Sequence, residues 1–362
     1  MKYLNVLLIF VVVAVVAEFA NWNPLVVFAA SGLAMIPLAG LMGAATEALA
    51  IHTGPRLGGL LNATLGNAAE LIITIMAIRE GLLNPAINEQ MLELVRASLT
   101  GSIMGNILLV LGLAMLVGGL KHGTQKFDRS HAGINATLLM LAVAALVIPS
   151  IFSHSIETVN HDAVEYLSLG VAGLMIGLYA LALIYQFRER RTMTLEDDHQ
   201  AVAEHEGPHW SVGRGVIVLV LATGAIVWMS ELLVGSIEHV VVEVGISEFF
   251  LGIILIPLIG NVAEHLVAVQ VAAKNKMELS LAISVGSSLQ IALLVAPLLV
   301  FVSLLMGNPL TLVFNQFELI ALMAAVLIAG LVSLDGESNW LEGAMLLTIY
   351  IILALAFFWL PM

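Results

Sequence analysis

The residues best suited to chemistry in this sequence are two glutamates that follow the same dipeptide. Glu70 closes the pentad GNAAE at 66–70, and Glu264 closes GNVAE at 260–264, 194 residues later. Each lies near the middle of a long apolar stretch, where an ionised carboxylate costs about 3 kcal/mol on insertion scales. Because two such costly charges follow the same Gly-Asn pair, the pattern predicts one cation site made from two related halves.

The asparagine of each pentad belongs to the same predicted site. In a helix, Asn67 and Glu70 project from one face, and Asn261 and Glu264 repeat that spacing. Two carboxylates and two amide oxygens suit a hard divalent cation such as Ca²⁺, which takes 6–8 oxygen ligands in irregular geometry. The chain has no cysteine, which argues against a site built for zinc or copper. Glu70 and Glu264 are therefore the predicted metal ligands.

Further residues are candidates for the walls of this site. Gly66 and Gly260 leave room for a close approach, and a distorted helix there would release backbone carbonyls. The second wall is expected to contain small polar side chains from two other spans. Such side chains are also ordinary hydrogen-bond partners between membrane helices, and both interpretations stay open. These candidates are Ser102, Asn106, Ser287, Ser288 and Gln290.

The same carboxylates can bind protons. Two like charges close together in a low dielectric are unfavourable, so an empty site should take up protons, and Ca²⁺ should drive them off. Competition between the cation and protons for Glu70 and Glu264 produces antiport with no further device. The alternative is a structural pair of glutamates that hold helices together through buried hydrogen bonds.

Three more ionisable residues are candidates for a proton or cation path. Glu47 and Glu231 lie toward the ends of their apolar stretches, where they either line hydrated entry paths or solvate helix ends. His265 follows Glu264 but has no counterpart in the first pentad, where Leu71 stands. It either tunes Glu264 and moves protons or is an ordinary buried histidine.

Composition places the chain in the lipid bilayer. Of its 362 residues 60% are hydrophobic and 11% charged, with a mean hydropathy of +1.04. Soluble domains are about a quarter charged, and about 20 apolar residues cross a membrane. The 13 lysines and arginines form no basic cluster of the kind that binds nucleic acid. The expected fold class is therefore an all-α polytopic membrane protein.

The hydropathy pattern predicts about eleven transmembrane helices. The expected organisation is an uncleaved N-terminal helix in 1–22, a first half in 23–187, an acidic cytoplasmic loop or helix in 188–210 and a second half in 211–362. The expected spans are 3–20, 24–52, 57–79, 92–120, 132–152, 163–187, 212–239, 247–273, 278–306, 312–333 and 340–360.

Lysine and arginine are distributed unequally between the two sides of this topology. Arg79 and Arg96 stand alone on one side, and the other eleven basic residues fall on the opposite side. Cytoplasmic loops are the positive ones. The N-terminus is therefore expected in the cytoplasm and the C-terminus outside.

The two halves form a predicted inverted repeat. Spans three and eight contain the pentads and are five crossings apart, so they traverse the bilayer in opposite directions. Spans 2–6 and 7–11 are then equivalent five-helix halves, with the N-terminal helix left over. Folds of this kind bind substrate near the bilayer midplane, between the repeats. Glu70 and Glu264 are expected to face each other there.

Several stretches together resemble the Ca²⁺/H⁺ antiporter family (cation/proton exchangers, CAX) of the cation/Ca²⁺ exchanger superfamily. Besides the two pentads, Lys274 to Met277 and the last span fit this pattern, and the resemblance runs from about residue 30 to the C-terminus. The matching stretches are 45–50, 59–71, 230–236, 260–265, 274–277, 286–292 and 338–343.

The resemblance implies eleven helices, with an acidic helix in part of 195–206. It implies that Glu70 and Glu264 bind Ca²⁺ and H⁺ alternately, assisted by Asn67 and Asn261, and that no cofactor is needed. It also implies alternating access, with the first helix of each half sliding past the core. Such proteins export cytoplasmic Ca²⁺, and short loops favour the plasma membrane of a bacterium or archaeon.

Three other functions are considered. A Na⁺/Ca²⁺ exchanger of the same superfamily usually has a proline beside the acidic residue of each repeat, where Ala69 and Ala263 stand here. A channel would conduct Ca²⁺ without obligatory proton movement. An intramembrane hydrolase is disfavoured because neither HExxH nor GxSxG occurs, so the chain is not expected to be an enzyme.

Overall fold

The computed structural model describes residues 4–157, 162–193 and 210–360, and these are almost entirely helical. The chain begins with a 3₁₀ turn, η1 (Leu4–Leu8), that leads into α1 (Ile9–Phe19) and then α2 (Pro24–Leu65). The next elements are α3 (Ala68–Leu83), η2 (Pro85–Ile87), α4 (Asn88–Met104), the π-helical turn η3 (Gly105–Val110), α5 (Leu111–His122), β1 (Gln125–Lys126), α6 (Arg129–Glu157) and α7 (Asp162–Met193).

The second half of the chain follows a similar order. It starts with α8 (Val212–Gly235) and the short α9 (Ile237–Val244). The remaining elements are α10 (Glu248–Phe250), the π turn η4 (Leu251–Leu255), α11 (Ile256–Ala272), α12 (Met277–Gln290), the π turn η5 (Ile291–Val295), α13 (Ala296–Met306), α14 (Gln316–Val332), β2 (Glu337–Ser338) and α15 (Trp340–Phe358).

Helix lengths agree with a polytopic membrane protein. Within the described residues, eight helical stretches are long and apolar enough to cross a bilayer, and two shorter apolar helices cover Leu4–Phe19 and Gln316–Val332. The expected acidic helix in 195–206 lies outside the described residues.

The expected third span, 57–79, is not a single helix. The sequence placed a loop near 53–56, but the backbone of α2 stays helical through that stretch to Leu65. The break falls at the first pentad instead, where Asn67 has φ −101° and ψ 21°. The polar residues near Arg56 suggested a loop, but polarity alone does not interrupt a helix. Gly66 has no side chain and so allows the backbone to leave the helical conformation.

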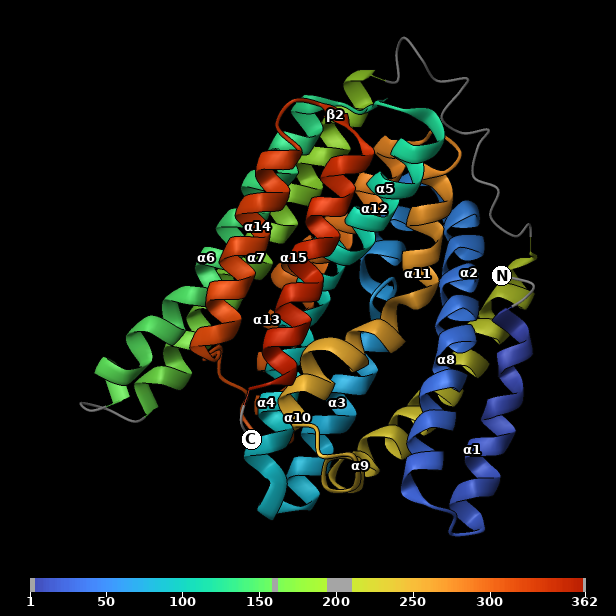
Figure 1. The fold of residues 1–362 in the computed structure, drawn as a ribbon, viewed down its shortest axis with the longest axis vertical. Helices are drawn as coiled ribbons and strands as arrows, with labels where there is room; N and C mark the ends of the chain where they lie inside the picture. The colour runs from blue at the N-terminus through green and yellow to red at the C-terminus, as the bar shows by residue number, and fades with distance from the viewer. Residues whose placement is uncertain (1–3, 158–161, 194–209, 361–362) are drawn as a thin grey trace.

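The helices form a bundle with three parts (Figure 1). On one flank, α1 packs on α2, and α2 runs alongside α8. On the opposite flank, α6 packs against α7 and α14. The helices α3, α4, α11 and α12 lie between these flanks, and α5 packs closely against α15. The middle group contains most residues of the predicted cation site. The exceptions are Gly66 and Asn67, in the break before α3, and Asn106, which follows α4 in η3.

The two ends of the bundle are distinct (Figure 1). One end holds the antiparallel pair β1–β2, in which Gln125 pairs with Ser338 and Lys126 with Glu337. We call this the β1–β2 end. The opposite end holds α9 and the end of α15, and we call it the α9 end.

The tightest helix crossing in the middle group joins α4 to η4. A Cβ atom on Gly101 would lie only 2.0 Å from the carbonyl oxygen of Ile253, so only glycine fits at this position. Since Ser102 is the next residue, this crossing brings it close to α11.

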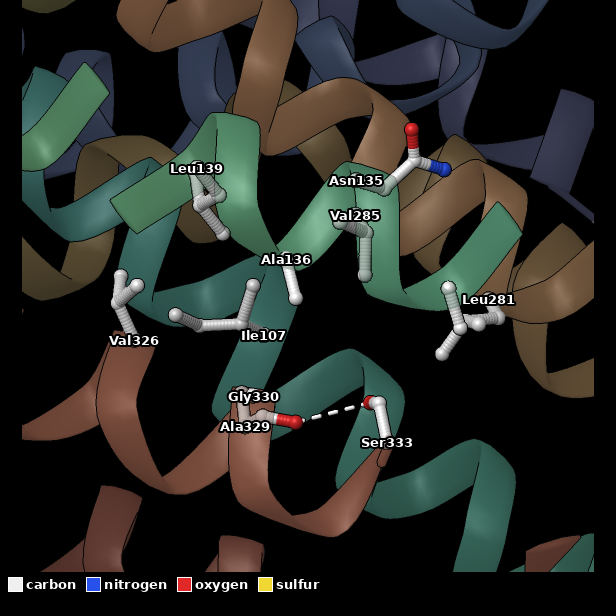
Figure 2. A pocket seen from close by; sticks show the side chains of 11 residues that line it. Ile107, Asn135, Ala136, Leu139, Leu281, Val285, Val326, Ala329, Gly330 and Ser333 are labelled. Carbon is white, nitrogen blue, oxygen red and sulfur yellow. Dashed lines mark hydrogen bonds between the residues drawn. The ribbon is translucent and has the colours of Figure 1, made fainter. Parts of the chain in front are cut away.

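A small cavity of about 10 Å³ lies among η3, α6, α12 and α14 (Figure 2). Its walls are mostly apolar, and the hydroxyl of Ser333 is already occupied as a donor to the carbonyl of Ala329 at 2.8 Å. Such a volume holds at most one water molecule. The cavity is a packing gap and includes neither pentad.

Candidate functional site

Glu70 lies in the first turn of α3 and is buried, with 1% of its surface exposed. Helix N-termini favour negative side chains, which makes this position suitable for a carboxylate. The hydroxyl of Ser102, from α4, donates to Oε1 of Glu70. The second oxygen, Oε2, is buried and has no hydrogen-bond partner among the described residues. One carboxylate oxygen of Glu70 is therefore available for a ligand.

Glu264 lies in the middle of α11 and is held in an equivalent way. Oγ of Ser287, from α12, lies 3.1 Å from its Oε2. Glu264 is only partly buried, unlike Glu70. Each glutamate thus contacts a serine of its own half, and the two carboxylates are close enough to interact electrostatically.

The same two serines also contact the asparagines of the opposite half. Nδ2 of Asn261 donates to Oγ of Ser102 at 3.3 Å, and Oγ of Ser287 lies 3.0 Å from Oδ1 of Asn67. Both asparagines are buried. Each serine therefore joins the glutamate of its own half to the asparagine of the other half. We call these two hydrogen-bonded sets, Glu70–Ser102–Asn261 and Glu264–Ser287–Asn67, the crossed network.

Two further polar pairs extend the site and have no counterpart in the other half. Nδ2 of Asn67 donates to Oε1 of Gln290 at 2.8 Å. Nε2 of His265 lies 3.1 Å from Oδ1 of Asn106, whose own Nδ2 is buried without a partner among the described residues. His265 therefore lies beside the second wall of the site.

Two π-helical turns follow the serines. Asn106 lies in η3, and η5 begins directly after Gln290. A π turn inserts an extra residue into the helix and often marks a functional site. Both turns rotate the downstream helix relative to the serine, which a hydropathy pattern does not reveal.

The remaining predicted residues have other roles in the structure. Glu231 forms an ion pair with Arg79 at 2.8 Å, and both side chains are about half exposed. Glu47 is partly buried in α2. Ser288 turns away from the carboxylates and contacts the carbonyls of Ile103 and Ser284 at 3.4 and 3.1 Å. These contacts fit the second interpretation left open for it, an ordinary hydrogen-bond partner between helices, and it lies on a different face of α12 from Ser287.

The expected distortion at the two pentad glycines occurs at only one of them. Gly66 lies in the break between α2 and α3, but α11 passes through Gly260 without interruption. In the second half the irregular segment is η4, which comes before α11. A Cβ on Gly260 would lie 3.6 Å from Cδ1 of Ile73, which is ordinary contact.

The donor atoms around the two glutamates are suited to a hard cation. Two carboxylates, amide oxygens and hydroxyls form an oxygen set of the kind that Ca²⁺ prefers. Among the described residues there is no cluster of three or more His, Cys, Asp and Glu side chains. The charge of two carboxylates matches one divalent cation.

Comparison with known proteins identifies the family. The family model described as sodium/calcium exchanger protein matches residues 23–188 and 214–359. The Ca²⁺/H⁺ antiporter of Aphanothece halophytica is 41% identical over 366 residues, which cover 98% of this chain and 96% of that protein. The Ca²⁺/H⁺ antiporter ChaA of Bacillus subtilis is 43% identical, and the match covers 95% of each chain.

A solved structure is similar over almost the whole chain. It is the selenium-substituted Ca²⁺/H⁺ antiporter protein YfkE, with 40% sequence identity and a TM-score of 0.83. The match covers 99% of this chain and 100% of that one. These matches show that the chain belongs to the sodium/calcium exchanger family, within its Ca²⁺/H⁺ antiporter group.

Proposed function

We propose that this protein is a secondary transporter, and not an enzyme, that exchanges Ca²⁺ for H⁺ by alternating access. Ca²⁺ and protons are the transported substrates and compete for Glu70 and Glu264, with Asn67 and Asn261 assisting. The observation that supports this most directly is the crossed network, in which each serine joins a glutamate of one half to an asparagine of the other. A change in the charge of either glutamate therefore acts on both halves at once.

The contacts of Ser287 indicate how a proton is accommodated. Its hydroxyl has one hydrogen but lies within reach of two acceptors, Asn67 and Glu264. If Glu264 is protonated, its carboxyl donates to Ser287 and Ser287 donates to Asn67, so every group is satisfied. If Glu264 is ionised, Asn67 and Glu264 compete for the one hydrogen of Ser287. A bound cation would then coordinate the oxygen that receives no hydrogen bond.

Glu70 fits the complementary role. Ser102 accepts from Asn261 and donates to Glu70, so its hydrogen bonds are complete in either charge state of the glutamate. The unpartnered Oε2 of Glu70 then needs a proton or a cation, because a buried acceptor without a partner costs about 1–3 kcal/mol. Alternation between proton and Ca²⁺ at this oxygen is the exchange step.

The inverted repeat and its orientation are also part of the proposal. Lys121, Lys126 and Lys274 all lie near the β1–β2 end. We assign this end to the cytoplasm, with the N-terminus cytoplasmic and the C-terminus outside, in the plasma membrane of a prokaryote. The lipid bilayer then surrounds the apolar flanks.

Unequal packing of the two halves supports a state that is closed toward the α9 end. Gly101, the residue before Ser102, packs against Ile253 of η4 with no room for a Cβ. Gly286 stands at the equivalent place in the second half, and no described atom lies within 4 Å of a Cβ built on it. Alternating access would close this second crossing and loosen the first, as α2 and α8 slide past the core.

The test is transport by the purified protein in proteoliposomes. A ΔpH should drive ⁴⁵Ca²⁺ uptake, and Glu70→Gln and Glu264→Gln should each abolish it while the protein stays folded. The matched control is Glu342→Gln, because glutamine retains the capping hydrogen bond that Glu342 makes at the start of α15. Near-normal transport by either site variant contradicts the shared site. Strict dependence on a Na⁺ gradient, or Ca²⁺ flux without proton movement, contradicts the exchange reaction.

A further inference from the structure

The helices that hold the two glutamates are fastened at equivalent points. Ile78 lies eight residues after Glu70 in α3, and Ala272 lies eight residues after Glu264 in α11. The two positions are therefore separated by the same 194 residues as the glutamates. The backbone carbonyl of each accepts a hydrogen bond from the side-chain amide of a buried residue. In both cases that amide comes from the other half of the chain.

Gln125 fastens α11 at the β1–β2 end. It follows α5 in the first half and is buried, with Nε2 3.0 Å from the carbonyl oxygen of Ala272 and 2.9 Å from Oδ1 of Asn275. Ala272 is the last residue of α11, so its carbonyl has no partner within the helix. Nζ of Lys121 and Nε2 of His122 lie 2.9 Å from the next carbonyl, that of Ala273. The end of α11 is thus held by side chains of the first half, in addition to the backbone N–H of Asn275, which donates to the same carbonyl of Ala272 at 3.0 Å.

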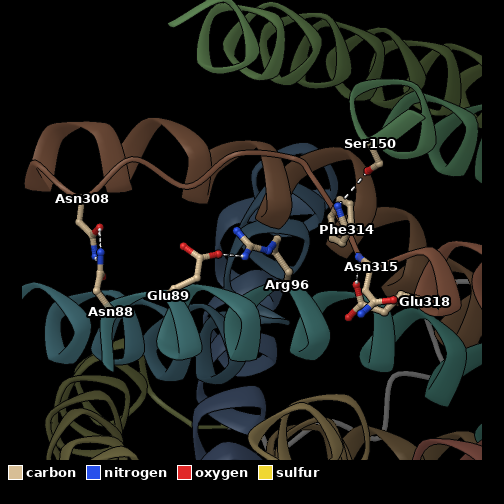
Figure 3. A network of polar contacts seen from close by, with 8 residues as sticks. All are labelled: Asn88, Glu89, Arg96, Ser150, Asn308, Phe314, Asn315 and Glu318. Carbon is tan, nitrogen blue, oxygen red and sulfur yellow. Dashed lines mark hydrogen bonds and ion pairs between the residues drawn. The ribbon is translucent and has the colours of Figure 1, made fainter. Parts of the chain in front are cut away.

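Asn308 fastens α3 at the α9 end (Figure 3). It follows α13 in the second half and is also buried, with Nδ2 3.1 Å from the carbonyl oxygen of Ile78. Asn308 exchanges two hydrogen bonds with Asn88 at the start of α4, at 2.7 and 3.1 Å. The arrangement mirrors that of Gln125, with an amide that bonds one carbonyl and one asparagine.

We propose that Gln125 and Asn308 are positioning residues for the cation site, each setting the axial position of the other half's glutamate-bearing helix. A helix rises 1.5 Å per residue, so a slip of one residue would break contacts of 3.0 and 3.3 Å between Asn67 and Ser287 and between Asn261 and Ser102. Both amides lie about 12 Å along the helix from the glutamate they position. They act through the helix and do not touch the cation.

This inference rests on the proposed function, but it is tested with other variants than Glu70→Gln and Glu264→Gln. Gln125→Met and Asn308→Leu keep the side-chain volume and remove the amide. In proteoliposomes each should raise the KM for Ca²⁺ about tenfold, because the free energy of about one buried hydrogen bond that aligns the site is lost. Vmax should change less than about twofold. A purely structural role would lower the amount of folded protein and Vmax but leave KM unchanged.

Ser303→Ala is the matched control. Ser303 Oγ, in α13, is also buried. It accepts from the backbone N–H of Leu310, in the same connection as Asn308, at 2.8 Å and donates to the carbonyl of Val300 at 2.9 Å, within α13. Its KM should stay at the wild-type value. The proposal is overturned if Gln125→Met and Asn308→Leu keep a normal KM, or if Ser303→Ala raises KM as much as they do.

A cross-linking experiment decides the matter if those variants fail to fold. The chain has no cysteine, so Gln125→Cys with Asn275→Cys can be joined by a short bis-methanethiosulfonate reagent. Before cross-linking, the double variant should show the raised KM. After cross-linking, its KM should return to within about twofold of the wild-type value. Loss of transport on cross-linking would mean that this contact opens during the cycle and would overturn the proposal. Failure of Glu70→Gln and Glu264→Gln to stop transport would instead overturn the shared site.

Discussion

Asn261 donates a hydrogen bond across the interface between the two halves to Ser102, 3.3 Å away, and Ser102 donates in turn to Glu70. This relationship makes the glutamate of one half sensitive to the position of the other half's helix. It is the reason that we treat the two pentads as one site and not as two separate carboxylates.

The serines that join the halves should determine Ca²⁺ affinity. Ser287→Ala removes the donor shared by Asn67 and Glu264, and we expect an affinity loss of about tenfold, since a hydrogen bond to a charged group is worth about 1.5–3 kcal/mol. Ser288→Ala is the neighbouring control, because Ser288 contacts only backbone carbonyls. ⁴⁵Ca²⁺ binding to both purified variants measures this. Equal affinity in the two would show that Ser287 has no role at the site.

The packing of Gly101 predicts an unequal response of the two halves to an added methyl group. Gly101→Ala places a Cβ 2.0 Å from Ile253, which should cost about 1–3 kcal/mol through overpacking. Gly286→Ala meets no described atom within 4 Å and should leave stability unchanged. Thermal unfolding in detergent compares them. Equal melting temperatures would contradict the unequal packing of the two crossings.

The ion pair between Arg79 and Glu231 links α3 to α8, one of the helices expected to slide. Because both side chains are about half exposed and solvent screens the pair, Arg79→Gln should have little effect on stability. A covalent link is a different matter. Arg79→Cys with Glu231→Cys, joined by a short bis-methanethiosulfonate reagent, should stop ΔpH-driven uptake, and reduction should restore it. Undiminished uptake with the link intact would exclude relative movement of α3 and α8.

Glu70 and Glu264 stand out in the sequence because they are unusual in their surroundings. They are ionisable groups in apolar stretches, and the shared spacing predicted an asparagine in the same site, although Asn67 lies in the break before α3 and not in the helix. Spacing could not reveal that Asn67 contacts Ser287 of the other half, since this depends on how distant helices pack. Shared helical spacing suggested that both members of a pentad act together, but Asn67 and Glu70 contact different serines.

Other features had no distinct signal in the sequence. Gln125 stands in a short polar connection, where a glutamine is ordinary, and only its burial against Ala272 distinguishes it. The π turns η3, η4 and η5 consist of the same apolar residues as the helices around them. The break between α2 and α3 was predicted at the wrong place because the residues from Thr53 to Arg56 are polar enough for a loop. The backbone of this segment is helical.

The most direct test of the central claim is simultaneous measurement of Ca²⁺ binding and proton release in weakly buffered detergent solution. If Ca²⁺ and protons compete for Glu70 and Glu264, the wild-type protein should release protons in proportion to the Ca²⁺ bound. Glu70→Gln and Glu264→Gln should bind little Ca²⁺ and release almost none. Tight Ca²⁺ binding by the wild-type protein with no proton release, or by either variant with full release, would contradict the account.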